Sequence, residues 1–491
     1  MYRLYRRFLI SGSVTLLLGS LPFTGALAMD EILIEDDSGL GEEIAIDVGE
    51  EGPGEIIFDD VIDLDSGADD PFAETPVQDP ASSDDPEGLA SDITFAVDDV
   101  RFEYGHQLRD ASDADNEIYG KLALSLNWQP QPQWEFQLAG RLDGYSQESR
   151  ADWSEVRADY GDSFVRYRGD SFRLTAGTQT VVWGRMDELP LSDRVSTADL
   201  SRFVLDRLED RRRSNPMLRL ESNLGDGKLD LVWLYDFRPA ELPDQNSIWY
   251  PVDTANGRIL GVAKNDIPAA AVIGATILED EPDGDGGFGL RYTESLFFGD
   301  IGLTVAHTRR SVPYYRLTAL GAPGTFKTEY PRSWTIGADT AVDALGATWR
   351  GEFVYTSDNP VTLRNLSYTT TEGVEWGLGV ELHPGDGDTR VNLQLMGSNL
   401  IDPGAIFDRS EAYSLNGEID IPFDRERWRA KLNFLVGLDK KDLYLNPEIA
   451  FLAWAPHEFY LGLHYFDGEE QTLGGFHEDH SSINLGWRSQ F

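Results

Sequence analysis

The sequence predicts an all-β fold: a transmembrane, antiparallel outer-membrane β-barrel of about 18 strands, preceded by a disordered acidic tail. Three observations lead to this prediction. Segments of about ten residues alternate apolar and polar side chains, as barrel strands do. The connections between them alternate between short and long. After residue 28, no apolar run approaches the roughly 20 residues that a membrane-spanning helix needs.

The first 28 residues are expected to be a secretion signal. Arg3, Arg6 and Arg7 form a basic start, an apolar stretch follows, and Ala26 and Ala28 provide the small side chains of a cleavage site. An uncleaved anchor is the alternative. The chain has no cysteine, which excludes a disulfide framework and thiolate zinc sites in an oxidising envelope. We therefore expect an exported protein that is stabilised by closure and packing of its fold.

Residues 29–93 are expected to form a disordered periplasmic tail. Up to residue 92 the segment contains 23 Asp or Glu and no Lys or Arg. Three units, 12 residues apart, each place two apolar side chains on one face of a short extended segment. The candidate docking residues are Ile32, Ile34, Ile44, Ile46, Ile56 and Phe58. The tail either docks a periplasmic or inner-membrane exporter component through tethered weak motifs, or is a linker whose repeat has no use.

The remaining chain, residues 94–491, repeats a period-2 pattern along its whole length. In one segment Trp134 and Phe136 alternate with Glu135 and Gln137, which puts the apolar side chains on one face of a strand. Strands are expected at residues 97–106, 118–128, 134–145, 162–168, 172–183, 216–223, 228–237, 288–297, 301–309, 333–342, 347–357, 373–383, 389–397, 412–421, 428–438, 442–454, 458–466 and 481–491. An even count places both termini on the periplasmic side. A count of 16 is the next alternative.

The connections separate a membrane barrel from a soluble sandwich, which shows the same alternation of side chains. Short joins are expected at 129–133, 169–170, 225–227, 299–300, 343–346, 384–388, 422–427 and 456–457, and long ones at 107–117, 146–161, 184–215, 238–287, 310–332, 358–372, 398–411 and 467–480. Outer-membrane barrels have short turns at one rim and long loops at the other. Only the short join at 439–441 departs from this order.

The chain ends on an alternating strand that contains Ile483, Leu485, Trp487 and Phe491. Trp487 with the terminal Phe491 resembles the C-terminal signature that outer-membrane barrels present to the barrel-assembly machinery. This resemblance implies insertion into the outer membrane of a Gram-negative cell, with membrane lipid around the barrel.

One long connection, 184–215, combines a helical pattern with many charges. Ser196 and Asp199 form a capping box. The apolar positions at helical spacing are Leu200, Phe203, Val204 and Leu208. The pattern predicts a short amphipathic helix. We expect it to lie against the inner barrel wall, and packing against other loops outside the barrel is the alternative.

The same loop balances seven Arg against seven acids. Opposed charges in a narrow water-filled pore set its ion selectivity, so the loop is expected to constrict the pore. The alternative, compatible with the first, is a structural network that pins the loop to wall charges such as Arg141 and Asp143. The candidate constriction residues are Arg185, Asp187, Glu188, Asp193, Arg194, Arg207, Asp210, Arg211, Arg212 and Arg213.

The stretch around this loop resembles a broad family of porin-like barrels that includes alginate-exporter-like proteins. The shared pattern is Gln-x-x-x-Trp-Gly-x-x-Asp after a strand, then an acid- and Arg-rich loop, then Pro and a new strand. Its positions here are Gln179, Trp183, Gly184, Asp187, Glu209, Asp210, Arg211 and Pro216, while Thr178 stands where the pattern has Arg. The resemblance implies a porin-like channel. It does not imply alginate as the substrate. Residues 93–491 carry a net charge near −25, whereas a polyanion needs a cationic lumen.

The sequence therefore predicts a channel that passes small solutes or an exported product, and not an enzyme. No G-x-S-x-G or H-E-x-x-H motif occurs, but an adhesin or structural barrel and a barrel hydrolase stay open as alternatives. His477 and His480 in the last long loop are expected to be solvated rather than to bind a metal. We expect no cofactor, no metal and no nucleic-acid partner, since phosphate binding needs basic faces. The oligomeric state is left open.

Overall fold

The computed structural model describes residues 93–109, 114–149, 152–187, 190–263, 266–278, 280–319, 321–385 and 388–491. The expected secretion signal, the acidic tail and its candidate docking residues Ile32, Ile34, Ile44, Ile46, Ile56 and Phe58 lie outside the described residues. Within the described ranges, no helix is long and apolar enough to cross a membrane.

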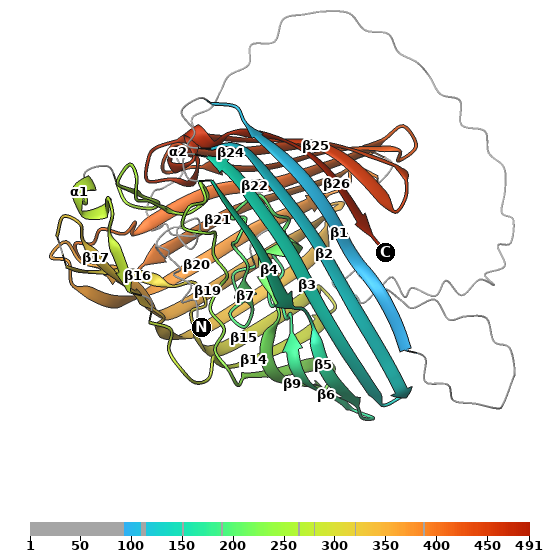
Figure 1. Ribbon diagram of the computed structural model, residues 1–491. Coiled ribbons are helices and arrows are strands. Elements are labelled where there is room, and N and C mark those ends of the chain that lie inside the picture. Colours follow the sequence, from blue (N-terminus) through green and yellow to red (C-terminus); the bar gives the residue numbers. More distant parts are fainter. Residues whose placement is uncertain are drawn as a thin grey trace, which may run out of the picture. The chain divides into compact units, whose positions relative to one another are not determined.

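The strands close into a single antiparallel barrel (Figure 1). They are β1 (Ile93–Gln107), β2 (Ala114–Gln131), β3 (Trp134–Ser149), β4 (Trp153–Tyr160), β5 (Ser163–Arg168), β6 (Phe172–Gln179), β9 (Asn215–Leu224), β10 (Gly227–Leu234), β14 (Gly287–Leu296), β15 (Gly299–Arg309), β18 (Arg332–Ala344), β19 (Ala347–Thr362), β20 (Tyr368–Leu382), β21 (Arg390–Leu400), β22 (Glu411–Phe423), β23 (Trp428–Gly437), β24 (Asp442–Trp454), β25 (His457–Gly468) and β26 (Ser482–Gln490). Because β4 and β5 both pair with β3, they share one position in the wall, and the 19 strands occupy 18 positions around the barrel. β1 pairs with β2 and with β26, which closes the ring. The predicted fold class is confirmed.

The prediction of long loops at 146–161 and 358–372 is wrong. β3 and β4 continue through most of the first segment, and β19 and β20 leave only residues 363–367 between them. The outward, exposed face of β4 carries Ser, Val, Ala and Tyr, so its apolar alternation is too weak to be recognised in the sequence. The eight expected short joins at the opposite rim are confirmed, each within a few residues of its predicted position.

The outer face of the barrel is apolar. Alternate side chains along the strands point outward and stay exposed, among them Leu138, Leu378 and Leu485. Near the short turns, aromatic rings pack on this face, as Trp134 does on Tyr167 at 4.9 Å between ring centroids. An apolar band with aromatic side chains at its edge is what a lipid bilayer requires of a barrel. The barrel is therefore a transmembrane one.

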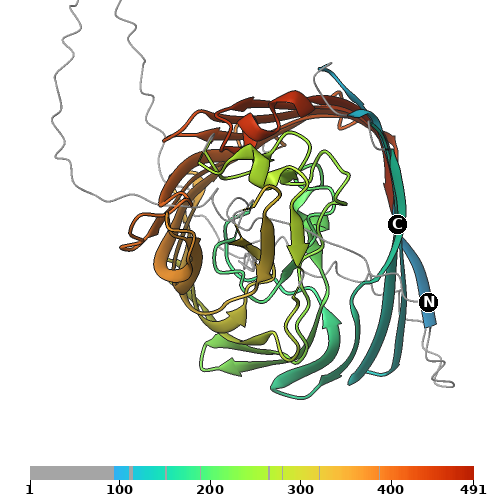
Figure 2. The same cartoon turned by 60° about the vertical axis from the view of Figure 1, so that its left-hand side comes forward.

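The 184–215 loop enters the interior of the barrel, where Figure 2 shows it inside the ring of strands. The short elements α1 (Ala269–Val272), β16 (Tyr314–Ala319) and β17 (Thr325–Glu329) instead project from the long-loop end of the wall (Figure 1). Residues 238–287 form an apolar core with parts of the 184–215 and 310–332 loops. Its buried members are Leu200, Ala240, Leu242, Tyr250, Val252, Ile259, Val272, Tyr315, Leu317 and Phe326. Much of the apolar core of this protein thus lies among its loops and not in its wall.

Candidate functional site

In its described residues, the 184–215 loop contains no α-helix. Its elements are β7 (Thr197–Ala198), η1 (Leu208–Arg211), which is a 3-10 turn, and β8 (Arg212–Arg213), which pairs with β7. The helix expected over 196–208 is therefore wrong. The local β-pair and ion pairs to the wall determine the backbone instead, and Phe203 adopts a left-handed φ of 55°.

The loop enters the lumen beside Glu352, an inward-facing residue of β19. Both oxygens of this carboxylate accept hydrogen bonds from the loop backbone. The donors are the N–H groups of Arg185 and Met186 to Oε1, and of Leu191 and Ser192 to Oε2. Gly184 passes this anchor with a φ of +117°, and a Cβ here would lie 2.5 Å from Glu352 Oε1. Only glycine fits this entry point.

Glycines in the wall make room for the apolar side chains of the loop. A Cβ at Gly377 would lie 3.0 Å from Met186, and one at Gly289 would lie 2.6 Å from Trp183. Trp183 also donates from Nε1 to Asp230 at 3.1 Å. Met186 and Leu191 are buried together with the wall residues Val354 and Met396. The wall is therefore shaped to receive the loop in this position.

Arg185 and Arg194 attach the first part of the loop to wall acids. Arg185 donates from Nε to Asp339 at 3.0 Å and from Nη1 to Asp300 at 3.2 Å, and Arg194 pairs with Glu375. Asp300 is the second residue of β15 and follows a short turn, so the loop reaches close to the short-turn rim. The two arginine side chains keep 24% and 25% of their surface exposed.

Asp187 lies in a cradle of three wall donors. Arg350 and Arg390 donate to its Oδ2 at 2.8 and 2.9 Å, and Asn392 donates to the same oxygen. Both arginines also pair with Glu381. The side chains of Asp187 and Arg390 are 17% and 34% exposed. Burial raises the pKa of the Asp187 carboxyl, and the two guanidinium groups, which lower this pKa, do not fully offset the effect.

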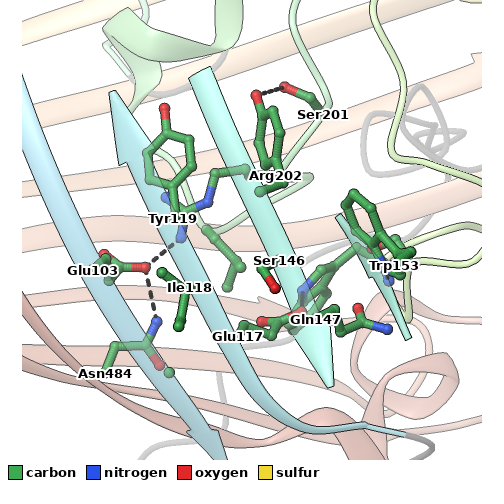
Figure 3. A pocket seen from close by; sticks show the side chains of 15 residues that line it. Glu103, Glu117, Ile118, Tyr119, Ser146, Gln147, Trp153, Ser201, Arg202 and Asn484 are labelled. Atoms are coloured by element: carbon green, nitrogen blue, oxygen red, sulfur yellow. Dashed lines mark hydrogen bonds and ion pairs between the residues drawn. The ribbon is translucent and has the colours of Figure 1, made fainter. Parts of the chain in front are cut away.

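The second part of the loop is held by a buried network around Glu103 of β1 (Figure 3). Glu103 accepts hydrogen bonds from Arg202 of the loop and from the wall residues Arg101, Tyr460 and Asn484. The side chains of Arg202 and Glu103 are only 7% and 4% exposed. The cavity of about 30 Å³ beside this network has room for about one water molecule, so it is too small to bind a solute.

Asp206 and Asp210 extend this buried network. Asp206 Oδ1 accepts hydrogen bonds from Arg101 Nη1 at 3.0 Å and from Arg202 Nη1 at 2.6 Å. Asp210 Oδ1 lies 2.5 Å from Lys121 Nζ. Burial alone would raise the pKa of Asp210, but Lys121 and Arg101 lower it to about 2. Asp210 is therefore a fixed negative charge with fixed partners.

Other predicted residues brace the loop internally. Asp193 accepts hydrogen bonds from Ser196 Oγ at 2.7 Å and from Arg212 Nε at 3.3 Å. Arg211 donates to two backbone carbonyls of the loop, those of Val204 and of residue 206. These side chains stabilise the shape of the loop.

The loop is also pinned to wall charges on β3 and β4. Arg141 Nη1 lies 3.1 Å from Asp199 Oδ2, and Arg141 Nε lies 2.6 Å from Asp143. Arg213 pairs with Asp159 at 2.9 Å. These contacts fit a structural network that pins the loop to the wall, the alternative to a constriction role. Among the predicted constriction residues, Arg185, Asp187, Arg194 and Arg207 keep the larger exposed surfaces, Asp193, Asp210, Arg212 and Arg213 are largely buried, and Glu188 lies outside the described residues.

His477 and His480 lie in the interior of the last long loop. Their side chains are enclosed by rings that include Trp249 and Phe476, and their Nδ1 atoms lie 3.0 Å apart. The expectation that they are solvated is wrong. Burial lowers the pKa of both, to about 4 for His480. Across the described ranges no group of three or more potential metal ligands occurs.

The wall partners of the loop were not recognised as site residues in the sequence. They include Glu103, Arg350, Glu352, Arg390 and Asn392. A signal for them exists, because each occupies a polar position of an alternating strand and therefore faces the lumen. The loop residue that each one meets depends on the path of the loop through the barrel, which no local pattern encodes.

Comparisons with known proteins identify a family. A family model described as a protein of unknown function (DUF1302) matches residues 58–450. A search of curated protein sequences finds no match. Similar solved structures include Acinetobacter baumannii OccAB1 (9% identity, TM-score 0.48, 82% of this chain and 98% of that chain) and Pseudomonas aeruginosa OccK8 (OprE) (8% identity, TM-score 0.46, 82% and 98%). Similarity at this level does not transfer a function.

Proposed function

The chain belongs to the DUF1302 family of proteins of unknown function, and we propose that it is an outer-membrane channel for small solutes, constricted by the 184–215 loop. The apolar outer face holds the barrel in the membrane, and the charged lumen provides a water-filled path. The loop narrows this path on the side of β15 to β21, where Arg185, Asp187 and Arg194 remain partly exposed.

The observation that carries this proposal is the exposure of charged side chains inside a closed barrel. Arg390, Asp300 and Lys431 face the lumen, and their side chains are 34%, 30% and 24% exposed. Arg390 and Asp300 lie at the short-turn ends of β21 and β15, and Lys431 lies three residues inside β23, so their exposure supports entry of water from the short-turn rim. Water therefore has access to the lumen between the loop and this part of the wall, and the opposed charges there set the local field that an ion experiences.

Substituted cysteines test the path directly, because the natural chain has no cysteine. Lys431→Cys places a thiol on the exposed lumen face of β23, and Gln394→Cys places one at a fully buried lumen position of β21. In planar bilayers, we expect a charged thiosulfonate reagent to lower the current through Lys431→Cys and to leave Gln394→Cys unchanged. No current from the parent protein, or no response of Lys431→Cys, would contradict the channel.

Removal of residues 184–215 tests the constriction. We expect a larger single-channel current and a shifted reversal potential. Glu352→Ala is a second variant for the case that the deletion prevents folding, since it keeps the loop and removes only the acceptor of four loop N–H groups. A folded variant with unchanged current would contradict the constriction while leaving the channel proposal standing.

The acidic tail is proposed to dock a periplasmic partner. Its three repeats motivate this, together with the position of β1, whose first residue Ile93 pairs with Trp128 near a short turn. The short-turn rim of an outer-membrane barrel faces the periplasm. Replacing the six apolar repeat residues by Ser should leave barrel assembly intact and reduce transport. Normal transport by a tailless protein would contradict docking. The exposed terminal Phe491 remains the proposed assembly signal.

A further inference from the structure

We propose that Arg350, Arg390 and Asn392 form a carboxylate-binding site of the channel, which the loop's own Asp187 occupies when no solute is present. This inference rests on the proposed channel function and names its solute class as small monocarboxylates. N–H donors from β19 and β21 converge on one carboxylate oxygen at the exposed side of the loop. Two guanidinium groups and an amide are a donor set suited to a carboxylate.

The charges around the cradle fit a solute with a single negative charge. Three basic and three acidic side chains are connected by ion pairs of 2.6 to 3.3 Å. They are Arg350, Arg390 and Lys431 against Asp187, Glu381 and Glu418. When the Asp187 carboxylate leaves, one positive charge is unmatched, and a monocarboxylate restores the balance. A dianion would leave an excess negative charge in a partly desolvated site, which is unfavourable.

The side chain of Asp187 can leave its donors without release of the loop. The backbone N–H groups of Met186 and Leu191, on either side of it, are bonded to Glu352, and both side chains are buried against the wall. Exchange with a solute therefore needs a rotation of one short, partly exposed side chain. The raised pKa of Asp187 agrees with this, since its charged form is incompletely compensated in place.

Asp210 is an example of a carboxylate that cannot exchange with a solute. It is buried between Lys121 and Arg101, and its pKa is lowered to about 2. A solute has no access to these partners, whereas Arg390 is exposed to the lumen. Of these two aspartates, only Asp187 combines wall donors, solvent access and a backbone that is held independently.

Benzoate and its neutral analogue benzamide are suitable probes. Asp187→Ala empties the cradle, and the double variant Asp187→Ala/Arg390→Gln removes a donor as well. A matched control adds Arg429→Gln to Asp187→Ala, because Arg429 is a lumen-facing, exposed cation paired with Asp420 outside the cradle. Titration calorimetry of the full-length protein in detergent measures binding, and KCl current in planar bilayers measures conduction independently.

We expect benzoate to bind Asp187→Ala about tenfold more tightly than the parent protein. The Arg429→Gln control should keep this gain, the double variant should lose it, and benzamide should not bind. Equal binding of benzoate and benzamide, or an unchanged affinity in Asp187→Ala, would overturn the carboxylate site even in a conducting channel. Tight benzoate binding without KCl current in any variant would overturn the channel and its solute, and would leave only a binding site.

Discussion

The two parts of the 184–215 loop are attached on different sides of the barrel, and their attachments differ in exposure. In residues 199–213, the pairs of Arg202 and Asp206 with β1 are at most 7% exposed. In residues 184–194, the partners include Asp300 and Arg390, whose side chains are 30% and 34% exposed. Breaking a buried pair leaves a charge unmatched and costs several kcal/mol, whereas exposed pairs contribute about 0–1 kcal/mol. Buried ion pairs therefore hold the second part, and we expect the first part, which Glu352 anchors, to line the proposed solute path.

Loss of the buried anchor should have the largest effect. Glu103→Ala removes one of the two carboxylates that Arg101 and Arg202 share and leaves them only Asp206 in common, and we expect a loss of about 3–5 kcal/mol in the free energy of unfolding. The temperature at which the folded electrophoretic band disappears measures it. The control is Asp424→Ala, which removes an exposed pair with Arg427 in a short turn and should change little. Equal effects of the two substitutions would show that burial does not distinguish the attachments.

Glu352→Ala should have the next largest effect, confined to the first part of the loop. Four backbone N–H groups lose their carboxyl acceptor, and we expect the attachment of residues 184–194 to weaken by about 3 kcal/mol. Glu352→Gln keeps one carbonyl acceptor, so it should weaken the attachment less than Glu352→Ala does. Limited proteolysis within the loop measures this attachment. Cleavage that stays as slow as in the parent protein would refute the role of Glu352.

Mild acid should weaken the second part of the loop alone. Phe203 packs on His477, and both His477 and His480 are buried and neutral. Their pKa values are lowered, to about 4 for His480, so an opened loop binds protons below pH 6.5 that the closed loop does not. At pH 5 this costs about 2 kcal/mol for His480. Between pH 7 and pH 5, hydrogen exchange corrected for the intrinsic rate should rise in residues 199–213 and in residues 469–481 around the histidines, but not in residues 184–194, and it should rise less in His480→Gln.

The smallest effect on stability is expected for Asp187→Asn, below about 1 kcal/mol. The substitution keeps the shape of the side chain and leaves the cradle with an excess positive charge. We therefore expect the reversal potential in a KCl gradient to shift towards chloride selectivity. Asp210→Asn is the matched change in the buried part and should lower stability without this shift. The opposite pattern would reverse the assignment of the two parts.

The number and order of the strands could be predicted because outward apolar alternation is a local signal, as around Leu378. The conformation of the loop could not be predicted, because its apolar residues belong to two different cores. Leu200 lies in the cluster of Tyr250 and Phe326, and Phe203 lies in a separate cluster with Phe466 and Phe476. The helical spacing of these residues predicted one apolar stripe that faces a single core. The partners of Asp187 were equally hidden, since Arg390 lies 203 residues away in sequence, and only the closed barrel brings them together.

The anchor at Glu352 has a consequence for how such a channel diversifies. Because this carboxylate binds the peptide N–H groups of Met186 and Leu191, it holds the loop independently of the side chain at residue 187. A substitution at residue 187 can then change the charge of the cradle while the loop keeps its position. We therefore expect single substitutions there to alter the proposed solute preference on an unchanged scaffold.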